Sequence, residues 1–429
     1  MEEEIIIEGD IPLTGEVNIS GAKNSALVII AAALLSRGNV YLDNVPNLTD
    51  ITTIIKLLKY IGADVSFENN SCFINAKNIN ENVAPYDLVS TMRASFFTLG
   101  PLLARFGEVK MPLPGGCAIG SRPVDIHLKG FKALGADVEI ENGLAIVKAN
   151  KLVGAKIYLD FPSVGATENI LMAATYAKGT TVIENVAREP EVVDLANFLN
   201  SMGAKIIGAG TPTIFVEGVE NLGDTNYKIM SDRIEAGSFM IAGAASGGDI
   251  IVNNAEEKVL HSLISKMVEV GVKVDVLSPE RIRVVGKGCH LKAVNLKTLP
   301  YPGFFTDLQS PMVSLLTKAE GTSIVHETVF ENRFMYVDEL NRMGADIRIE
   351  SNFAIIKGVD KLSGAPVRAT DLRAAAALAI SAFSAEGETI ISGLEHLDRG
   401  YERFTAKCSS LGAKIKRIPM EKPLVQATK

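Results

Sequence analysis

A hydrophobic residue, a glycine and a second small or apolar residue recur together six times along the 429-residue chain. The glycines of this motif are Gly62, Gly135, Gly203, Gly271, Gly344 and Gly412. Each of the last three lies 209 residues after its counterpart among the first three. Three equal spacings indicate a duplicated half, and each half contains three copies of one structural unit.

Each copy pairs two kinds of helix with short strands. The repeated glycine follows an amphipathic helix such as 49–61 and precedes an alternating strand such as 138–141. Glycine leaves a helix in the left-handed conformation without strain. The other helices are rich in alanine, apolar nearly all round and therefore expected to be buried; they cover 26–35, 94–104, 170–177, 239–245, 312–316 and 374–385. We expect the amphipathic helix of each copy to face outward, on the far side of a sheet.

The repeats predict an α/β protein of two domains, each with three βαβαββ-like units around a bundle of buried helices. A chain of 429 residues is too long for one core of ordinary size. We expect the first domain to span 22–230. The second should combine 1–21 with 231–419, which leaves 420–429 as a tail.

The charge balance excludes some functions and restricts others. The formal net charge of -7 does not favour binding to nucleic acid or to an anionic membrane. An anionic ligand must therefore be held by a local group of lysines and arginines. The start of the chain, 1–7, lacks the basic residues and the long apolar stretch of a secretory signal. The apolar run 26–35 is too short to span a bilayer, so we expect a cytoplasmic protein.

The cysteines and histidines predict neither a metal site nor a disulfide framework. The four cysteines lie far apart, at Cys72, Cys117, Cys289 and Cys408. None forms a CxxC pair, and the five histidines show no HxH or HExxH spacing. This pattern is typical of a protein of the reducing cytosol. We expect no metal and no other cofactor.

Charged side chains stand at the starts of the buried helices. They are Lys23, Arg93, Asp232, Arg233, Asp307, Asp371 and Arg373. The aspartates could be ordinary helix caps, but cations are unfavourable at a helix start and are not explained by capping. Helix starts carry free N–H groups that suit anions. We expect the six starts to converge on a cleft between the domains that binds an anionic ligand.

The stretch 112–125 contains three glycines and three prolines, which is typical of a loop able to move. Cys117 stands in this loop, five residues before Arg122. A thiol near a cation is more reactive than a buried one, and we expect Cys117 to be reactive. The alternative, a cysteine that acts as a small hydrophobic residue, is the better interpretation of the other three. The glycines do not form a Walker loop, because no GK[ST] follows.

Six motifs together resemble the UDP-N-acetylglucosamine 1-carboxyvinyltransferase family of enolpyruvyl transferases. They are 21–24 (GAKN), the Cys117 loop, 163–167 (SVGAT), 187–191 (AREPE), 330–334 (FENRF) and 398–401 (DRGY). The resemblance runs from about residue 5 to about residue 418. It implies a two-domain inside-out α/β barrel. It also implies transfer of the enolpyruvyl group of phosphoenolpyruvate to the 3-hydroxyl of UDP-N-acetylglucosamine, with release of phosphate, in the first committed step of peptidoglycan synthesis.

The resemblance also implies roles for individual residues. Lys23 and Asn24 correspond to the pair that binds phosphoenolpyruvate, and Arg93, Arg122 and Arg399 to other cations around the substrates. Contacts to the UDP-sugar are implied for Arg122, Pro123, Val124, Asp125, Ile126, Ser163, Val164, Gly165, Asp307 and Val329. Cleft positions without an assigned individual role are implied for Glu331, Arg333, Asp371 and Arg373.

The implied chemistry assigns Asp307 as the base and Cys117 as the acid. Lys23 and Arg399 hold the leaving phosphate together with Arg122. Fosfomycin, an epoxide, is expected to alkylate Cys117. One departure concerns 160–162, which reads Asp-Phe-Pro where some members of the family have a lysine; this affects only the account of uracil binding.

Two alternatives remain at this stage. The first is the same fold acting on shikimate 3-phosphate, although such an enzyme lacks the cysteine loop and needs more cations for its phosphorylated acceptor. The second is a non-catalytic repeat ring such as a DNA clamp, whose inward helices should carry stripes of lysine and arginine. The oligomeric state is left open.

Overall fold

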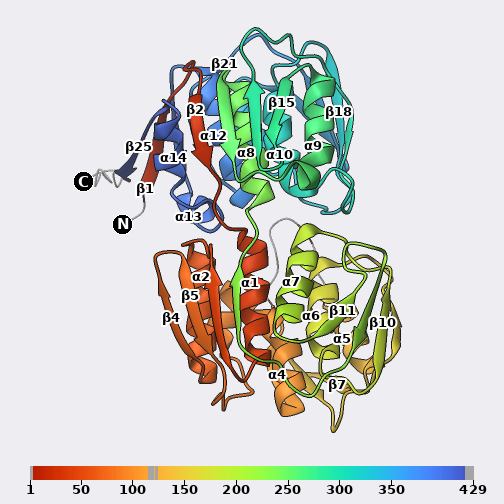
Figure 1. Cartoon of the computed structure of the whole chain (residues 1–429). Helices are drawn as coiled ribbons and strands as arrows, with labels where there is room; N and C mark the ends of the chain where they lie inside the picture. The colour runs from red at the N-terminus through yellow and green to blue at the C-terminus, as the bar shows by residue number, and fades with distance from the viewer. Residues whose placement is uncertain (1–2, 115–119, 121–123, 421–429) are drawn as a thin grey trace, which may run out of the picture. The chain divides into compact units, whose positions relative to one another are not determined.

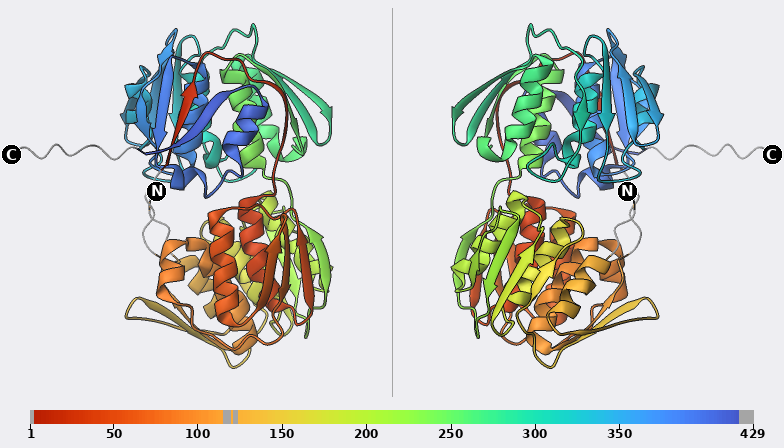
Figure 2. Two further views of the ribbon diagram at one scale, coloured as in Figure 1. Left: turned by 90° about the vertical axis from the view of Figure 1, so that its left-hand side faces the viewer. Right: turned by 90° about the vertical axis from the view of Figure 1, so that its right-hand side faces the viewer.

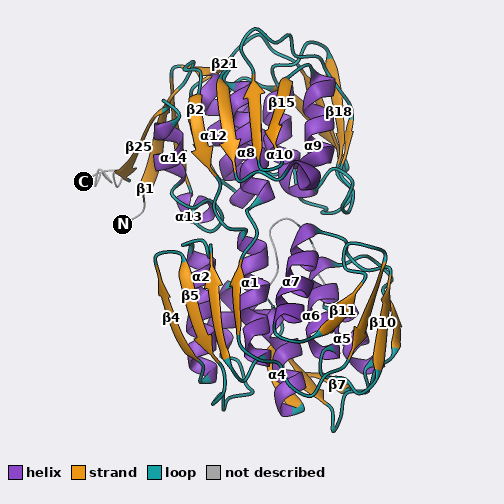
Figure 3. Cartoon of the chain, in the orientation of Figure 1, coloured by secondary structure: helices purple, strands orange, loops and turns teal. Residues whose placement is uncertain are grey.

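The alanine-rich segments form helices in which almost every side chain is buried. Every residue of α8 (Arg233–Ala245) is buried, and so is every residue of α12 (Leu372–Ser384) beyond the first. Small side chains allow close approach, and α8, α12 and α10 (Gln309–Leu316) pack against one another. In the other half of the chain, α4 (Leu99–Phe106) packs in the same way against α6 (Val164–Ala174). Figure 3 shows these helices inside their sheets.

The computed structural model describes residues 3–114, 120 and 124–420. The chain folds as two units (Figure 1). The Lys23 unit comprises Ser20–Asp232 and the short segment Pro300–Gly303. The Asp307 unit comprises the N-terminal segment up to Ile19, Arg233–Leu299 and the segment from Phe304 onward.

Among its described residues the Lys23 unit has three sheets, with strand orders β13-β3-β5-β4, β6-β8-β7 and β11-β12-β10-β9. Its strands are β3 (Asn39–Asp43), β4 (Asp64–Glu68), β5 (Ser71–Asn75), β6 (Glu108–Pro112), β7 (Asp137–Glu141), β8 (Leu144–Lys148), β9 (Lys156–Tyr158), β10 (Thr180–Glu184), β11 (Lys205–Ile207), β12 (Thr213–Glu217) and β13 (Thr225–Lys228). Its remaining helices are α1 (Lys23–Ala32), η1 (Ala33–Leu35), α2 (Thr49–Ile61), α3 (Tyr86–Thr91), η2 (Arg93–Thr98), α5 (Asp125–Ala133) and α7 (Pro190–Ser201).

In the part that the structure describes, the Asp307 unit has three four-stranded sheets, with orders β15-β16-β14-β2, β17-β18-β20-β19 and β22-β24-β1-β25, and the pair β21-β23. Its strands are β1 (Glu3–Glu8), β2 (Thr14–Asn18), β14 (Asp249–Asn253), β15 (Lys273–Ser278), β16 (Arg281–Val285), β17 (Leu296–Lys297), β18 (Thr322–His326), β19 (Asp346–Glu350), β20 (Phe353–Lys357), β21 (Leu362–Ser363), β22 (Pro366–Arg368), β23 (Ala385–Glu386), β24 (Glu388–Ser392) and β25 (Lys414–Pro419). Its remaining helices are α9 (Glu257–Val270), η3 (Thr306–Leu308), α11 (Val337–Arg342), α13 (Leu394–Leu397) and α14 (Phe404–Ser410).

The first strands of the chain complete sheets whose other members come from the second half. β1 pairs antiparallel with both β24 and β25, and β2 pairs parallel with β14. In the Lys23 unit, the late strand β13 returns to pair parallel with β3. The chain therefore closes each unit with a strand distant in sequence, and the two lobes are joined by more than one crossing of the chain.

The strands bury one face only, and this corrects the expected position of the amphipathic helices. In β3, Val40 and Leu42 are buried while Tyr41 between them is half exposed. A sheet with one apolar face accepts helices on one side. Accordingly α2 packs directly against α1, and α9 directly against α8. The prediction that these helices lie on the far side of a sheet is wrong, whereas the inside-out arrangement, with helices within sheets, is confirmed (Figure 2).

No helix in the described part of the chain is long and apolar enough to cross a membrane.

The repeated glycines have a conformational requirement that can be tested at Gly203. Its φ is +107°, and a Cβ added there would meet no atom within 4 Å. A side chain is therefore penalised by the left-handed backbone alone. Gly223, also exposed, has no such φ, and its Cβ would lie at an ordinary 3.8 Å from the Met202 carbonyl oxygen.

We predict that Gly203→Ala lowers the free energy of unfolding by about 1–2 kcal/mol relative to Gly223→Ala. Both changes stiffen the unfolded chain equally, so that contribution cancels in the comparison. Urea unfolding followed by circular dichroism measures the difference. Equal midpoints for the two variants would contradict the conformational explanation of the repeat.

Candidate functional site

Lys23 is the first residue of α1 and is held by two carboxylates of the Lys23 unit. It is 9% exposed, and its Nζ lies 3.3 Å from Oδ2 of Asp50, which stands in the first turn of α2. Its backbone N–H donates to Oδ2 of Asp232 at 3.2 Å. A cation at a helix start is unfavourable, and these two acids offset that cost. The side chain of Asp232, from the second half of the sequence, thus caps α1 of the first half. Asp232 occupies in the second half the position that Lys23 occupies in the first.

The first turn of α1 is also fixed by a buried carboxylate that sequence analysis did not select. Asp194 of α7 accepts hydrogen bonds from the Ser25 hydroxyl, from the Tyr227 hydroxyl at 2.6 Å and from the Met230 N–H at 3.2 Å. Burial raises the pKa of Asp194, and these hydrogen bonds partly oppose the rise. The network ties the helix start that carries Lys23 to the segment that leads out of the unit.

A second polar cluster joins the starts of α5 and α6. Asn169 of α6 donates to the Phe96 carbonyl at 2.9 Å, contacts Nδ1 of His127 at 3.2 Å and accepts from the Gly100 N–H at 2.7 Å. Burial, together with the charge of Arg93, lowers the pKa of His127 to about 3, so the imidazole is neutral. The cluster links η2, α4, α5 and α6 through hydrogen bonds between uncharged groups.

This cluster brings together two segments predicted to contact one ligand. α5 begins at Asp125, and the His127 ring lies so close to Gly165 at the start of α6 that an added Cβ would stand 3.3 Å from its Cε1. Ser163 caps α6 by accepting from the Ala166 N–H at 3.3 Å. The expected segments 124–126 and 163–165 are thus neighbours within the Lys23 unit.

The departure at Asp160 has a local counterpart. The Asp160 carboxylate forms an exposed ion pair with Nζ of Lys129 on α5, at 2.6 Å. A lysine of α5 thus stands beside Asp160.

In the Asp307 unit, three arginines surround one carboxylate at the start of η3. Nε of Arg373 donates to Oδ1 of Asp307 at 2.9 Å, and Nη2 of Arg333 donates to the same oxygen at 3.2 Å. Burial alone would raise the pKa of Asp307, but the charges of Arg373, Arg333 and Arg233 outweigh it and hold the pKa well below its usual range. Asp307 is ionised at neutral pH.

Each guanidinium of this cluster lies over an aromatic ring. Arg233 lies 4.3 Å from the centroid of Phe305, Arg333 lies 5.4 Å from that of Phe330, and Arg373 lies 5.8 Å from that of Tyr401. Cation–π contacts of this kind stabilise a desolvated cation. They also leave the N–H groups at the guanidinium edges available for oxygen acceptors.

A buried donor of Arg333 lacks an acceptor among the described residues. Arg333 is 3% exposed, and its Nε has no hydrogen-bond partner among the described residues. A buried donor without an acceptor is costly unless a ligand supplies one. The three arginines with this open donor form a site suited to an oxyanion.

Two further predicted residues have local roles in the same unit. Asp371 caps α12, because its Oδ1 accepts from the N–H groups of Arg373 at 2.8 Å and Ala374 at 3.2 Å. Arg399 is half buried and lies between two anchored neighbours. Asp398 pairs with Arg417, and the Tyr401 hydroxyl contacts Ser238 Oγ at 2.8 Å.

The predicted residues divide between the two units. The Lys23 unit holds Lys23, Asn24, Arg93, Val124, Asp125, Ile126, Ser163, Val164 and Gly165. The Asp307 unit holds Asp307, Val329, Glu331, Arg333, Asp371, Arg373 and Arg399. Cys117, Arg122 and Pro123 lie outside the described residues. Convergence of the two groups on one cleft stays a prediction.

The cysteines that are described differ from the predicted reactive one. Cys72 and Cys408 are buried, and burial raises the pKa of both thiols, that of Cys72 to about 12. Sγ of Cys289 donates to the Val285 carbonyl at 3.1 Å. Cys72 and Cys408 act as small hydrophobic residues, as expected.

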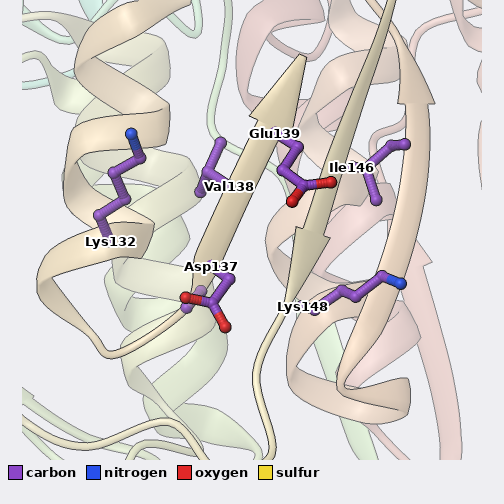
Figure 4. Close-up of a pocket in the computed structure, with 7 residues that line it drawn as sticks. Lys132, Asp137, Val138, Glu139, Ile146 and Lys148 are labelled. Atoms are coloured by element: carbon purple, nitrogen blue, oxygen red, sulfur yellow. The ribbon is translucent and has the colours of Figure 1, made fainter. Parts of the chain in front are cut away.

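A surface pocket lies between α5 and strands β7 and β8, away from the predicted residues. Lys132, Asp137, Glu139 and Lys148 line it, and Figure 4 shows that their charges alternate around its rim. Lys148 is already paired with Glu108 at 3.2 Å. The pocket shares no residue with the candidate site. In residues 3–114, 120 and 124–420, no group of three or more His, Cys, Asp or Glu side chains is arranged to hold a metal ion.

The chain is similar to known proteins over nearly its full length. The family described as EPSP synthase (3-phosphoshikimate 1-carboxyvinyltransferase) matches residues 7–408. UDP-N-acetylglucosamine 1-carboxyvinyltransferase 2 of Carboxydothermus hydrogenoformans is 54% identical over 416 residues, covering 97% of this chain and 99% of that protein. The UDP-N-acetylglucosamine 1-carboxyvinyltransferase of Halothermothrix orenii is 54% identical over 415 residues, covering 97% and 99%.

Solved structures share the fold at lower identity. The enolpyruvyl transferase NikO from Streptomyces tendae superposes with a TM-score of 0.88 at 24% identity, covering 98% of this chain and 100% of that one. EPSP synthase from Acinetobacter baumannii has a TM-score of 0.75 at 18% identity, covering 98% and 100%. These likenesses show the two-unit fold.

The arginine cluster yields a test that does not depend on any reaction. We predict that Asp307→Asn tightens the binding of inorganic phosphate about tenfold, because it removes the carboxylate that competes for the arginines. Isothermal titration calorimetry at low salt measures the affinity. Asp338→Asn, which removes an exposed carboxylate of α11, is the matched control. Equal affinities for both variants would contradict an anion site at this cluster.

Proposed function

The chain belongs to the EPSP synthase family of carboxyvinyltransferases, and from this premise we propose that it transfers the enolpyruvyl group of phosphoenolpyruvate to the 3-hydroxyl of UDP-N-acetylglucosamine, releasing phosphate. The observation that carries the choice of acceptor is the 54% identity, over 97% of the chain, to enzymes named for UDP-N-acetylglucosamine. The EPSP synthase compared above is only 18% identical. The chain is an enzyme, a transferase.

The side chains of the buried helices beyond their first turns argue against a DNA clamp. Beyond its first three residues α8 carries only small and apolar side chains, and the same holds for α12 beyond Arg373. A nucleic-acid ring needs basic side chains along the helices that face its ligand. Charge confined to the helix starts fits a small anion instead.

Phosphoenolpyruvate carries a phosphate and a carboxylate, so its site requires several cations. In the proposed site Lys23 acts from one unit, and Arg373, Arg333 and Arg399 from the other. Arginine binds planar carboxylate and phosphate oxygens through paired N–H groups, whereas lysine acts as a point charge. The open Nε of Arg333 supports this assignment, since a ligand oxygen would satisfy it. Arg122 and Asn24 complete the set on the ground of their motifs.

The proposed reaction breaks the C–O bond of phosphoenolpyruvate by addition and elimination. The 3-oxygen of the sugar bonds to C2 of phosphoenolpyruvate while its proton passes to a base, and C3 gains a proton from an acid. The tetrahedral adduct then loses phosphate as the C2–O bond breaks. C3 returns one proton, and the C2=C3 double bond re-forms. Both steps need fixed cations around the phosphate and carboxylate.

Asp307 is the proposed base, and its two oxygens have different roles. Both arginine contacts fall on Oδ1, while Oδ2 accepts no hydrogen bond from the described residues. We assign proton acceptance to Oδ2. The arginines keep Asp307 ionised but also weaken it as a base. An anion bound to Arg373 and Arg333 offsets part of their charge, so phosphoenolpyruvate itself strengthens the base.

Cys117 is the proposed acid. The stretch 112–125 around it is rich in glycine and proline, and Arg122 follows five residues after the cysteine. The UDP moiety is assigned to segments 124–126 and 163–165, which the His127–Asn169 cluster holds side by side. Val329 and the Asp307 side chain are the proposed contacts to the sugar.

The product is the first committed intermediate of peptidoglycan synthesis, so we place the enzyme in cell-wall formation and, through it, in the maintenance of cell shape and in division. Both substrates are phosphorylated metabolites of the cytosol, where we expect the reaction to occur.

A phosphate-release assay tests the acceptor directly. We predict release of phosphate from phosphoenolpyruvate only when UDP-N-acetylglucosamine is present, because the attacking hydroxyl belongs to the sugar. Shikimate 3-phosphate and a reaction without acceptor are the controls. Release that depends on shikimate 3-phosphate would replace the proposed acceptor with the alternative one.

Cys117→Ala is expected to lose most turnover while it still binds UDP-N-acetylglucosamine, since the thiol acts on phosphoenolpyruvate alone. Cys289→Ala, which removes a hydrogen-bonded thiol elsewhere, should keep full activity. Intact-mass and peptide analysis after treatment with fosfomycin should find the adduct on Cys117. Full activity of Cys117→Ala, or an adduct on buried Cys72, would refute the assignment.

A further inference from the structure

Glu327 directly follows β18. Its buried carboxylate accepts hydrogen bonds from four donors. It is 2% exposed. Its Oε1 accepts from the Thr298 hydroxyl at 2.8 Å and from the N–H groups of Val329 at 2.8 Å and Phe330 at 3.2 Å. Its Oε2 accepts from the Thr306 hydroxyl at 2.8 Å. A buried ionised carboxylate is tolerated when its lone pairs are satisfied in this way.

The donors come from three segments, namely Thr298 after β17, Thr306 at the start of η3, and the loop after β18; the last two carry parts of the candidate site. The Oε2 side holds Thr306, and the next residue is Asp307. The Oε1 side holds Val329 and Phe330, and the Phe330 ring lies under the guanidinium of Arg333. One carboxylate therefore spans the gap between the start of η3 and the loop after β18.

These hydrogen bonds stabilise the fold, because an apolar residue in place of Glu327 would leave buried donors without an acceptor. Glu327 also joins the backbone of Val329 and Phe330 to the Thr306 side chain. The hydrogen bond from Arg333 to Asp307, at 3.2 Å, is near the upper limit for N–H···O hydrogen bonds. A small displacement of either segment therefore breaks it.

We infer that Glu327 is a positioning residue of the reaction, one that fixes Asp307 against Arg333 and holds the backbone of Val329 and Phe330 toward the acceptor sugar. This rests on the proposed function, in which Asp307 receives the proton of the sugar hydroxyl. Glu327 touches no substrate and acts through Thr306 on one side and through the loop on the other.

Thr306→Val removes the Thr306 contact of Glu327 and leaves its contacts to the loop of Val329 and Phe330 in place. The Thr306 hydroxyl donates to Glu327, and valine has nearly the same shape. We expect kcat to fall about tenfold, while KM for UDP-N-acetylglucosamine stays within about twofold because the contacts of Glu327 to that loop are intact. The acid limb of the pH–kcat profile should also move, since the contacts between Asp307 and the arginines change.

Thr317→Val is the matched control. Thr317 is also buried, and its hydroxyl donates to the Ser314 carbonyl at 2.7 Å at the C-terminal end of α10. Thr317→Val also removes a buried hydroxyl, but this hydroxyl does not contact Glu327. We therefore expect kcat, KM and the pH profile to stay within about twofold of wild type. Glu327→Gln should retain most turnover, because its amide oxygen still accepts from the loop and its NH₂ donates to the Thr306 hydroxyl.

The outcomes are distinct. If wild type turns over and Thr306→Val behaves like Thr317→Val, the positioning role of Glu327 is wrong while the proposed function stands. A parallel loss in both threonine variants, with an unchanged pH profile, would indicate a structural effect only and would also overturn the inference. Wild type without turnover on UDP-N-acetylglucosamine would remove both the function and the inference.

Discussion

The structure depends on pairing cations that stand where isolated helices disfavour them. Lys23 and the arginines Arg233 and Arg373 occupy the starts of buried helices, where the helix dipole repels positive charge. Each is stabilised by groups from other elements. Asp50 and Asp232 hold Lys23, while Asp307 and two aromatic rings hold the arginines. A fold that retains such costly placements keeps its charges fixed before any ligand arrives, which is what stabilisation of a developing charge requires.

The duplicated halves use this principle in different ways. In one half the helix start carries a lysine, and in the other the equivalent position is Asp232, which caps the lysine helix. The Lys23 unit relies on single charges and on a neutral histidine–asparagine cluster. The Asp307 unit relies on arginines stacked on aromatic rings. The two halves share one scaffold and differ in the charged residues at their helix starts.

Much of the fold was predictable because the structural repeat appears in the sequence as residues at regular spacing. The spacing of glycines such as Gly62 and Gly271 predicted two equivalent halves, and the alanine-rich segments predicted buried helices. The side of the sheet taken by α2 was predicted wrongly, although the alternation in β3 already indicated a sheet with one buried face. For the candidate site, motifs identified residues near helix starts. They did not identify Asp194 or Glu327, whose donors come from segments far apart in sequence and which resemble ordinary surface acids until the chain is folded.

The central claim is that fixed cations allow this chain to break the C–O bond of phosphoenolpyruvate and not its P–O bond. Phosphoenolpyruvate labelled with ¹⁸O at the bridging oxygen, incubated with the enzyme and UDP-N-acetylglucosamine, tests it most directly. The account predicts that the label is found in the released phosphate, by mass spectrometry or by the isotope shift of its ³¹P resonance. Label retained in the carbon product would mean that the P–O bond is broken, and would contradict the account.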